Sequence, residues 1–404
     1  MYKKAKHIAE VLHEKGYIAY YAGGWVRDFL MHCDSDDIDI ATNAPPEVIQ
    51  SLFAHTVPIG SAFGIILVII DEHQYEVATF RKDLEYKDGR RPSSIEFTTA
   101  LEDAKRRDFT INGMFYDPLK NEVIDYVGGK EDIEKKIIKA IGNPHERIKE
   151  DRLRMLRAVR LSARFDFVIE EDTKKAIIAH ANELLPYVAI ERIVQEFTKM
   201  SKNQKLKKGL LTLHEFGILK NIFKELSSVD QKTLEERLLY LDLFPKEAPT
   251  IAKLLDLFEE MSLTSKIQLC EYLKLSNEDI NFVTSYHEIK ELLKGPLSDY
   301  DYASIYANKN SSVILKILGA HLPVLQKKIF LEEHEKRQHE LSSFINRIKN
   351  KDPVVKAQLL LQEGIKPSPI LGALLNEAEK IAVNEKIEDP QKIIKILKKS
   401  SWPK

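Results

Sequence analysis

Cysteine and long apolar runs are scarce in this sequence of 404 residues. Its two cysteines, Cys33 and Cys270, lie far apart, which argues against a disulfide framework or a zinc site and fits a reducing compartment. No apolar run reaches the length of a membrane span, and the first residues lack the apolar core of a signal peptide. We therefore expect a cytoplasmic protein that does not enter the membrane.

An excess of charge of either sign is also missing. The chain has 61 basic and 62 acidic residues, and its net charge is -1. A neutral total does not exclude nucleic acid, because a local basic face is what binds phosphate. Hydrophobic residues make up 44% of the chain, which is more than one core usually holds at this length, so we expect two to four domains.

The texture of the sequence changes near residue 140. Before that point, short β-branched runs between turns predict strands in residues 17–23, 36–42, 63–71, 74–80, 94–99 and 122–129. After about residue 141 we find only helical spacing of apolar residues, punctuated by proline and glycine. The pattern predicts an α+β domain with a small sheet, followed by an all-helical remainder.

The stretch "DDIDIAT" places two carboxylates, Asp37 and Asp39, two residues apart on an expected strand. Residues i and i+2 of a strand point to the same face, so both acids project together while Ile38 and Ile40 turn into the core. Hard oxygen ligands without histidine or cysteine suit Mg²⁺, which completes its shell with water and substrate phosphates. Such pairs are common on surfaces, and this one gains specificity only from its neighbours.

Those neighbours complete a candidate nucleotide site. Gly23 and Gly24 allow the backbone to approach phosphates closely, Arg27 can neutralise them, and the segment from Trp25 predicts the start of a helix. A third carboxylate is expected from an adjacent strand, and Glu76 in "QYEVATF" is the best candidate. The plain alternative for Glu76 is a strand residue that simply faces solvent.

Five motifs in order resemble the class II tRNA nucleotidyltransferase/poly(A) polymerase family, of the polymerase-β-like nucleotidyltransferase superfamily. They are "GGWVRDFLMHCDSDDIDIAT", "RKDLEYKDGRRP", "KRRDFTINGMFYD", "DYVGGKEDIEKKIIKAIGNP" and "EDRLRMLRAVRLSARFDF", within about the first 170 residues. The resemblance implies a catalytic head at 1–140, a helical neck with a nucleotide-template helix at 141–205, a body at 206–325 and a tRNA-binding tail at 326–404. The sequence departs from the family pattern at His32, where the family commonly has glycine, and at Gly113 and Lys139.

The resemblance also implies a role for each site residue. Asp37 and Asp39 match the Mg²⁺-binding catalytic pair, and Glu76 matches the third catalytic carboxylate. The residues that match nucleotide-binding positions are Gly23, Gly24, Arg27, Asp28, Arg107, Asp108, Asp151, Arg154, Arg157 and Arg160. The implied partners are CTP, ATP and the tRNA 3′ end.

Asp151 and Arg154 carry the sharpest implication. On one helix, Asp151, Arg154 and Arg157 would share a face, with Met155, Leu156 and Val159 packed on the other side. Most such patterns are solvated helices with salt bridges. In the family, the matching pair is a protein template: the aspartate accepts from the exocyclic amino group that C and A share, and the arginine donates to a ring nitrogen or carbonyl.

Two polar segments add weaker expectations. "RKDLEYKDGRRP", with Asp83, Asp88, Gly89 and Arg90, predicts a mobile loop. In relatives that add the terminal A, this loop helps the pocket switch from C to A, so its presence favours full CCA or A addition over CC addition alone. The C-terminal lysines Lys392, Lys395, Lys398, Lys399 and Lys404 fit either tRNA phosphates or a plain amphipathic helix.

Two rival functions stay open. A bacterial poly(A) polymerase would share the head motifs, although the segment around Asp37 lacks the basic and aromatic residues that those enzymes tend to show, and the chain has no long basic C-terminal extension. A non-catalytic RNA-binding relative would be expected to lose Asp37, Asp39, Glu76 or Arg107, all of which are present. Template-independent CCA addition to tRNA, with release of pyrophosphate, is the function that the resemblance favours.

Overall fold

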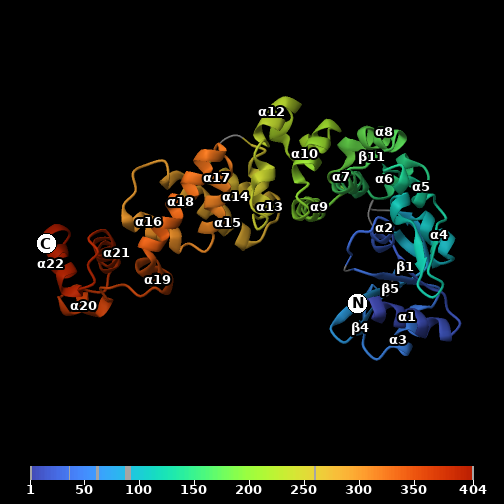
Figure 1. Ribbon diagram of the computed structural model, residues 1–404, viewed down its shortest axis with the longest axis horizontal. Helices are drawn as coiled ribbons and strands as arrows, with labels where there is room; N and C mark the ends of the chain where they lie inside the picture. Colours follow the sequence, from blue (N-terminus) through green and yellow to red (C-terminus); the bar gives the residue numbers. More distant parts are fainter. Residues whose placement is uncertain (1, 36, 61–62, 87–91, 259–260, 403–404) are drawn as a thin grey trace. The chain divides into compact units, whose positions relative to one another are not determined.

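Two compact units, Met1–Glu235 and Glu236–Lys404, make up the protein. The structure is a computed structural model that describes residues 2–35, 37–60, 63–86, 92–258 and 261–402 (Figure 1). Within these residues, strands occur only in the first unit, which confirms the predicted α+β head followed by helices. The finer division at residues 140, 205 and 325 stays a prediction, because the boundary between the two units lies at none of these positions.

A mixed sheet is the frame of the first unit. Its strand order is β3 (Thr56–Gly60), β4 (Ile65–Ile70), β5 (His73–Thr79), β2 (Asp39–Thr42), β1 (Ala19–Ala22), β8 (Phe115–Asp117) and β9 (Glu122–Ile124). Strands β2 and β5 are parallel, and the other neighbouring pairs are antiparallel. Ile40 pairs with Val77, so Asp39 and Glu76, one residue earlier, come side by side.

Each face of this sheet has its own apolar core. On one face lie helices α1 (Tyr2–Glu14) and α3 (Pro46–Leu52), whose Ile8, Leu12 and Ile49 are fully buried with strand residues such as Val77. The i, i+3, i+4, i+7 spacing of Ala5, Ile8, Ala9 and Leu12 is what makes α1 amphipathic. The other face packs against Ala100 and Ala104 of α4 (Ala100–Lys105).

Helices make up most of the first unit after the sheet. They are α5 (Gly129–Glu134), α6 (Pro144–Glu150), α7 (Leu153–Phe165), α8 (Glu171–His180), α9 (Ile190–Lys202), α10 (Leu206–Glu215) and α11 (Leu219–Ile222). The expectation of no strand after residue 141 is wrong at one place. β11 (Val168–Ile169) pairs in parallel with β10 (Ile137–Ile138). A strand of two residues is too short to produce an alternating pattern, which is why the sequence does not reveal it.

The second unit is helical throughout its described residues. After α12 (Gln231–Arg237), which spans the boundary, its helices are α13 (Thr250–Leu255), α14 (Leu263–Tyr272), α15 (Asn277–Leu292), α16 (Asp299–Ala307), α17 (Ser311–Ala320), α18 (Val324–Glu340), α19 (Ser342–Asn350), α20 (Ala357–Gln362), α21 (Pro369–Asn384) and α22 (Pro390–Ser400). None of the helices in the described part of the chain has the length and apolarity that a membrane crossing requires.

The last helix, α22, is amphipathic. Ile393, Ile394 and Leu397 are buried in the core that α22 shares with α21. The lysines Lys392, Lys395, Lys398 and Lys399 are exposed, and Lys404 lies outside the described residues. This packing explains the apolar positions of the helix, and contact of its lysines with tRNA stays a prediction.

Candidate active site

A cavity of about 550 Å³ in the first unit collects most of the expected site residues. Its lining is almost entirely polar and consists of Gly23, Gly24, Arg27, Asp37, Asp39, Arg81, Asp83, Arg106, Arg107, Asp108, Asn112, Asp151, Arg154, Arg157 and Arg160. The lining contains seven arginines and five aspartates. This mixture favours an anionic ligand that also has positively charged or hydrogen-donating groups for the carboxylates. A nucleoside triphosphate with a cation has this chemistry.

The predicted metal pair, Asp37 and Asp39, belongs to this lining. Asp39 is the first residue of β2 and Asp37 precedes the strand. Ile38 and Ile40, which alternate with these acids, are buried as predicted. Burial, followed by the charges of Asp37 and Glu76, raises the pKa of Asp39 to about 6 against the lowering effect of Arg107. The charged form of such a carboxylate is disfavoured, and a bound cation would stabilise it.

Glu76 is exposed on β5 next to Asp39, and it affects the charge of the site without lining the cavity. Across the described residues, no group of three or more His, Cys, Asp or Glu side chains is close enough to hold a metal. The residues that fit a hard divalent cation are therefore the pair Asp37 and Asp39, with the rest of its shell left to phosphate and water. The catalytic role of Glu76 stays a prediction.

The turn between β1 and α2 (Gly24–Leu30) brings the backbone close to these acids. Gly23 has φ 68°, and a Cβ there would lie 3.3 Å from Arg107 Nη1 and 3.9 Å from Asp39 Oδ2. Only glycine meets both demands without strain. His32, where the resemblance predicts glycine, also adopts a left-handed φ of 54°.

Arg27 is buried and held in place from behind. Its Nε and Nη2 donate to Asp28 Oδ1 at 2.8 and 2.6 Å, and its Nη1 donates to Asn112 Oδ1 at 2.5 Å. Asp28 also accepts from Arg164 Nη2 at 3.1 Å and does not line the cavity. The structure therefore places Asp28 behind Arg27 as its partner, so any effect of Asp28 on a nucleotide passes through Arg27.

Arg107 and Asp108 line the cavity from the segment after α4. Arg107 is held by Asp103, whose Oδ2 accepts from Nη2 at 3.0 Å. Asp108 Oδ2 accepts from Arg157 Nε at 2.8 Å. Burial alone would raise the pKa of Asp108, but the charge and hydrogen bonds of Arg157 and the donors Asn112 and Phe109 N–H hold it well below its usual range. Asp108 is thus a permanent anion that fixes Arg157.

The expected template residues come together, but not on a single helix. Helix α6 ends at Glu150 and α7 begins at Leu153, so Asp151 lies at the junction and only the arginines belong to α7. The prediction that Asp151 belongs to the same helix as Arg154 is wrong for this reason. The expected apolar face is confirmed, since Met155, Leu156 and Val159 are fully buried.

Each expected template residue has a charged partner in the structure, and so has Arg160. Asp151 accepts two hydrogen bonds from Arg192 of α9, at 2.8 and 3.2 Å, and Arg154 Nη1 donates to Glu150 Oε2 at 2.7 Å. Arg160 Nε donates to Glu196 Oε2 of α9 at 2.5 Å. Arg192 and Glu196 did not emerge from the sequence, because nothing local in α9 marks them as facing α7.

The segment predicted as a mobile loop is largely a hairpin. β6 (Arg81–Tyr86) pairs with β7 (Pro92–Phe97), and its Arg81 and Asp83 line the cavity. The loop prediction is therefore wrong for residues 81–86, which form strand β6. Asp88, Gly89 and Arg90 lie outside the described residues.

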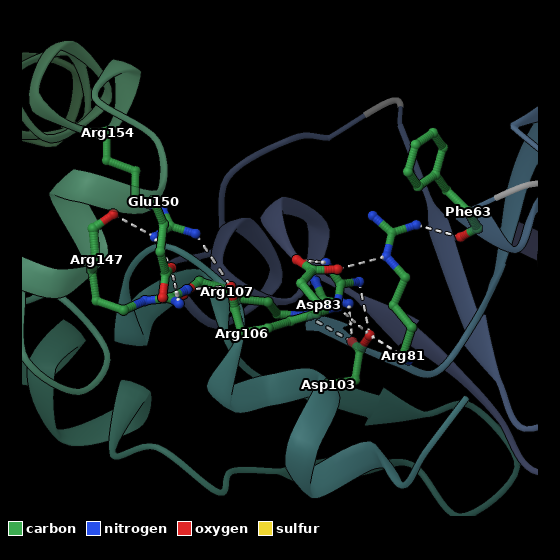
Figure 2. A network of polar contacts seen from close by, with 9 residues as sticks. All are labelled: Phe63, Arg81, Asp83, Asp103, Arg106, Arg107, Arg147, Glu150 and Arg154. Carbon is green, nitrogen blue, oxygen red and sulfur yellow. Dashed lines mark hydrogen bonds and ion pairs between the residues drawn. The ribbon is translucent and has the colours of Figure 1, made fainter. Parts of the chain in front are cut away.

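Figure 2 shows how the hairpin, α4 and the junction between α6 and α7 are connected by polar contacts. Asp103 is 1% exposed, and its Oδ1 accepts from Arg81 N–H at 3.2 Å and Arg106 Nε at 2.8 Å. Burial tends to raise the pKa of Asp103, but Arg107 and Arg106 outweigh it and lower that pKa. The i, i+3 and i, i+4 spacing of Asp103 from these arginines was a signal in the sequence that could have identified it.

Comparisons with known proteins identify the family of this chain. Residues 19–139 match the family described as "Poly A polymerase head domain", and residues 166–229 match "Probable RNA and SrmB- binding site of polymerase A". The chain is 35% identical to the CCA-adding enzyme of Ligilactobacillus salivarius, over 98% of this chain and 96% of that protein. The chain belongs to the CCA-adding enzyme family.

Two further relatives extend this result. The CCA-adding enzyme of Bacillus velezensis is 40% identical over 268 residues, which cover 62% of this chain and 67% of that protein. The crystal structure of Bacillus stearothermophilus CCA-adding enzyme in complex with CTP matches with a TM-score of 0.81 and 25% identity, over 98% of this chain and 97% of that one. As a member of this family, the chain is a nucleotidyltransferase, of a kind that is generally metal-dependent.

Proposed function

We propose that this protein adds CMP and AMP, taken from CTP and ATP, to the 3′ end of tRNA without a nucleic-acid template. The observation that carries the proposal is a single cavity in which the carboxylate pair Asp37 and Asp39 shares a lining with Asp151 and Arg154. One pair suits a cation at the triphosphate, and the other suits the hydrogen-bonding edge of a base. The names of the relatives with near-complete coverage support the same reaction.

The reaction follows from that arrangement. The 3′-hydroxyl oxygen of the RNA attacks the α-phosphorus and gives up its proton to water. The bond from that phosphorus to the β-phosphate oxygen breaks, and pyrophosphate leaves with the electron pair. We assign Mg²⁺ to Asp37 and Asp39; when bound, it supplies positive charge to the attacking hydroxyl and the leaving pyrophosphate. Arg27, Arg107 and Arg157 neutralise the triphosphate and orient it in the cavity.

Base choice in this proposal belongs to Asp151 and Arg154. A carboxylate accepts from the exocyclic amino group of C or A, and a guanidinium donates to the ring nitrogen beside it. The corresponding positions of U and G have the opposite polarity, so these bases leave buried groups unpaired.

We also place the protein in the cytoplasm, on the argument from its two cysteines, both of which are free.

The test uses tRNA transcripts that end before CCA, after C or after CC. Each is incubated with Mg²⁺ and with CTP and ATP, singly and together, and the products are resolved to one nucleotide. Growth of the shortest transcript by CCA, followed by arrest, is the expected result. Addition of A alone, or of C alone, would assign a partial activity, and a long A ladder on any RNA would identify a poly(A) polymerase.

A variant at the metal pair distinguishes the proposed enzyme from a non-catalytic RNA-binding relative. Asp39→Ala is expected to bind tRNA as the wild type does and to add no nucleotide. Unchanged nucleotide addition by this variant would show that Asp39 takes no part in the reaction. Absence of addition by the wild-type protein, with tRNA binding intact, would instead favour the binding protein.

A further inference from the structure

Arg147 is a charged residue beside the active site that lines no part of the cavity. It belongs to α6, and its side chain is about nine-tenths buried. Figure 2 shows it beside Glu150, on the side of Arg106 and Arg107 that is opposite to Asp103. The sequence analysis did not single it out, because one arginine in a helix carries no local signal.

The contacts of Arg147 are made mainly with the backbone of a distant segment. Its Nη2 donates to the carbonyl oxygens of both Arg106 and Arg107, the latter at 2.8 Å. Its Nη1 forms an ion pair with Glu150. Its own carbonyl oxygen accepts from Arg154 Nη1 at 2.6 Å. One residue thus contacts the chain some forty positions earlier and the template arginine seven positions later.

In the proposed function, these two contact regions serve the two parts of the nucleotide, its phosphates and its base. Arg107 has its guanidinium beside Gly23, and its charge acts on Asp39, which places it at the metal end. Arg154 and the junction residue Asp151 form the base-recognition end. Two other contacts join these regions. Arg154 Nη2 donates to the Arg106 carbonyl oxygen at 3.4 Å, and Asp108 pairs with Arg157, but Arg154, Asp108 and Arg157 all line the cavity and are available to the nucleotide itself.

We propose that Arg147 is a positioning residue that sets the distance between the base-recognition end and the metal end of the site. Its guanidinium fixes two consecutive carbonyls, and so the backbone from which Arg106 and Arg107 extend. The same residue fixes Arg154 through its carbonyl. A base held by Asp151 and Arg154 is then at the distance that brings the α-phosphate to Asp37 and Asp39. This inference rests on the proposed function.

The arrangement predicts a specific kinetic effect. Without Arg147, every arginine that contacts the nucleotide is still present, so binding changes little. The α-phosphate is misplaced, however, and a displacement of about 1 Å can cost on the order of 100-fold in rate. If Arg147 were purely structural, its removal would instead reduce thermal stability and the amount of active protein. Turnover would be normal in the molecules that remain folded.

The experiment compares the full-length wild type with Arg147→Ala, Arg147→Lys and the control Lys149→Ala. Lys149 is an exposed residue of the same helix that does not line the cavity. Active protein is counted by single-turnover addition, and kcat and KM are measured for CTP and ATP on the matching transcripts. Both Arg147 variants are expected to lose about 10- to 100-fold in kcat with KM within about threefold, and the control none.

Chemical rescue makes the test specific to the guanidinium. Guanidinium chloride, kept below denaturing concentration, is expected to restore part of the turnover of Arg147→Ala and none of that of Arg147→Lys. Normal kcat per active molecule in both variants would overturn the proposal, and so would a change confined to KM or a failure of rescue. If both variants fail to fold, Arg147 serves the fold as such and the proposal is rejected. If the wild type adds no nucleotide, the proposed function fails first.

Discussion

At the scale of single residues, the main feature of the site is that each arginine of the cavity is fixed by an acid. Asp28 holds Arg27, Asp103 holds Arg107, Asp108 holds Arg157, and Glu196 holds Arg160. A guanidinium that already has a carboxylate partner loses little conformational freedom when a triphosphate binds. The site is therefore arranged before the nucleotide arrives. Asp37 and Asp39 are the exception, since they repel each other until a cation is present.

Burial of Asp39, together with that repulsion, makes its charged form destabilising for the metal-free fold. Its pKa of about 6 lies above the ordinary value of 3.8, so its contribution to stability is full below pH 3.8 and is lost as the pH rises through about 6. Asp39→Asn is expected to raise the free energy of unfolding of the metal-free protein by about 1–3 kcal/mol at about pH 7.5.

Denaturant unfolding in EDTA measures this effect. The gain should shrink as the pH is lowered towards about 4, because the wild-type carboxyl is then neutral as well. Asp34→Asn, at an exposed acid of the same segment, is the matched control and should change nothing. A destabilised Asp39→Asn variant at neutral pH would contradict the charge argument.

Base choice is the second expectation at this scale. Asp151→Ala and Arg154→Ala should each raise incorporation of U and G relative to C and A more than they weaken nucleotide binding, because the discriminating groups are removed while the phosphate-binding arginines remain. Competition assays with mixed nucleotides on one transcript measure the ratio. If misincorporation of UTP and GTP stays at the wild-type level in both variants, the two residues do not read the base.

At the scale of elements, Asp103 connects the hairpin to α4 and to the cavity arginines. It is buried, and it accepts from the backbone of Arg81 and from the side chains of Arg106 and Arg107. Removing the charge of a buried ion pair leaves the partner charges uncompensated, so Asp103→Asn is expected to cost about 3–5 kcal/mol of folding stability. It should also slow nucleotide addition, since two lining arginines lose their support.

The pH dependence of this contribution has a definite sign. Because the pKa of Asp103 is lowered, its stabilisation is present above its ordinary value of 3.8 and is lost as the pH falls through the lower folded value. Thermal unfolding at neutral pH gives the comparison. Glu102→Gln is the control, at a partly exposed carboxylate one residue away that is paired with Lys105. Equal effects of the two substitutions would show that Asp103 has no special place in the network.

At the scale of the whole molecule, the two compact units predict two unfolding transitions in calorimetry. CTP with Mg²⁺ should raise only the transition of residues 1–235, which contain the cavity, because a ligand stabilises the unit that binds it. A single transition that shifts as a whole would show that the two units unfold together.

His321 allows the stability of the second unit to be tested independently of the first. Its Nδ1 lies 3.0 Å from the Ile317 carbonyl and its Nε2 lies 3.1 Å from Asp256 Oδ2, so both nitrogens face acceptors and the charged form is favoured. Burial lowers its pKa, but the hydrogen bond and charge of Asp256 outweigh burial and raise it. This stabilisation is full below pH 6.5 and is lost as the pH rises through the higher folded value.

His321→Gln should therefore lower the second transition at about pH 6 and have less effect at about pH 9, without changing the response of the first transition to CTP. Calorimetry at the two pH values measures both effects. An equal shift at both pH values would mean that packing, and not the proton, accounts for the role of His321.

The sequence by itself determined the class of fold, the family and most of the lining of the site. It could do so because these depend on short-range patterns, such as the alternation from Asp37 to Ile40 and the helical spacing around Met155. The head motifs were visible for the same reason, since each is a run of neighbouring residues.

Tertiary structure alone decided which acid holds which arginine, that Asp151 lies between two helices, and that Arg192 and Arg147 support the site. The chain offers 61 basic and 62 acidic residues, and local rules cannot choose among pairs as distant as Arg164 and Asp28, which are 136 positions apart. Packing of the sheet and helices makes that choice, because it fixes which buried charges come within hydrogen-bonding distance.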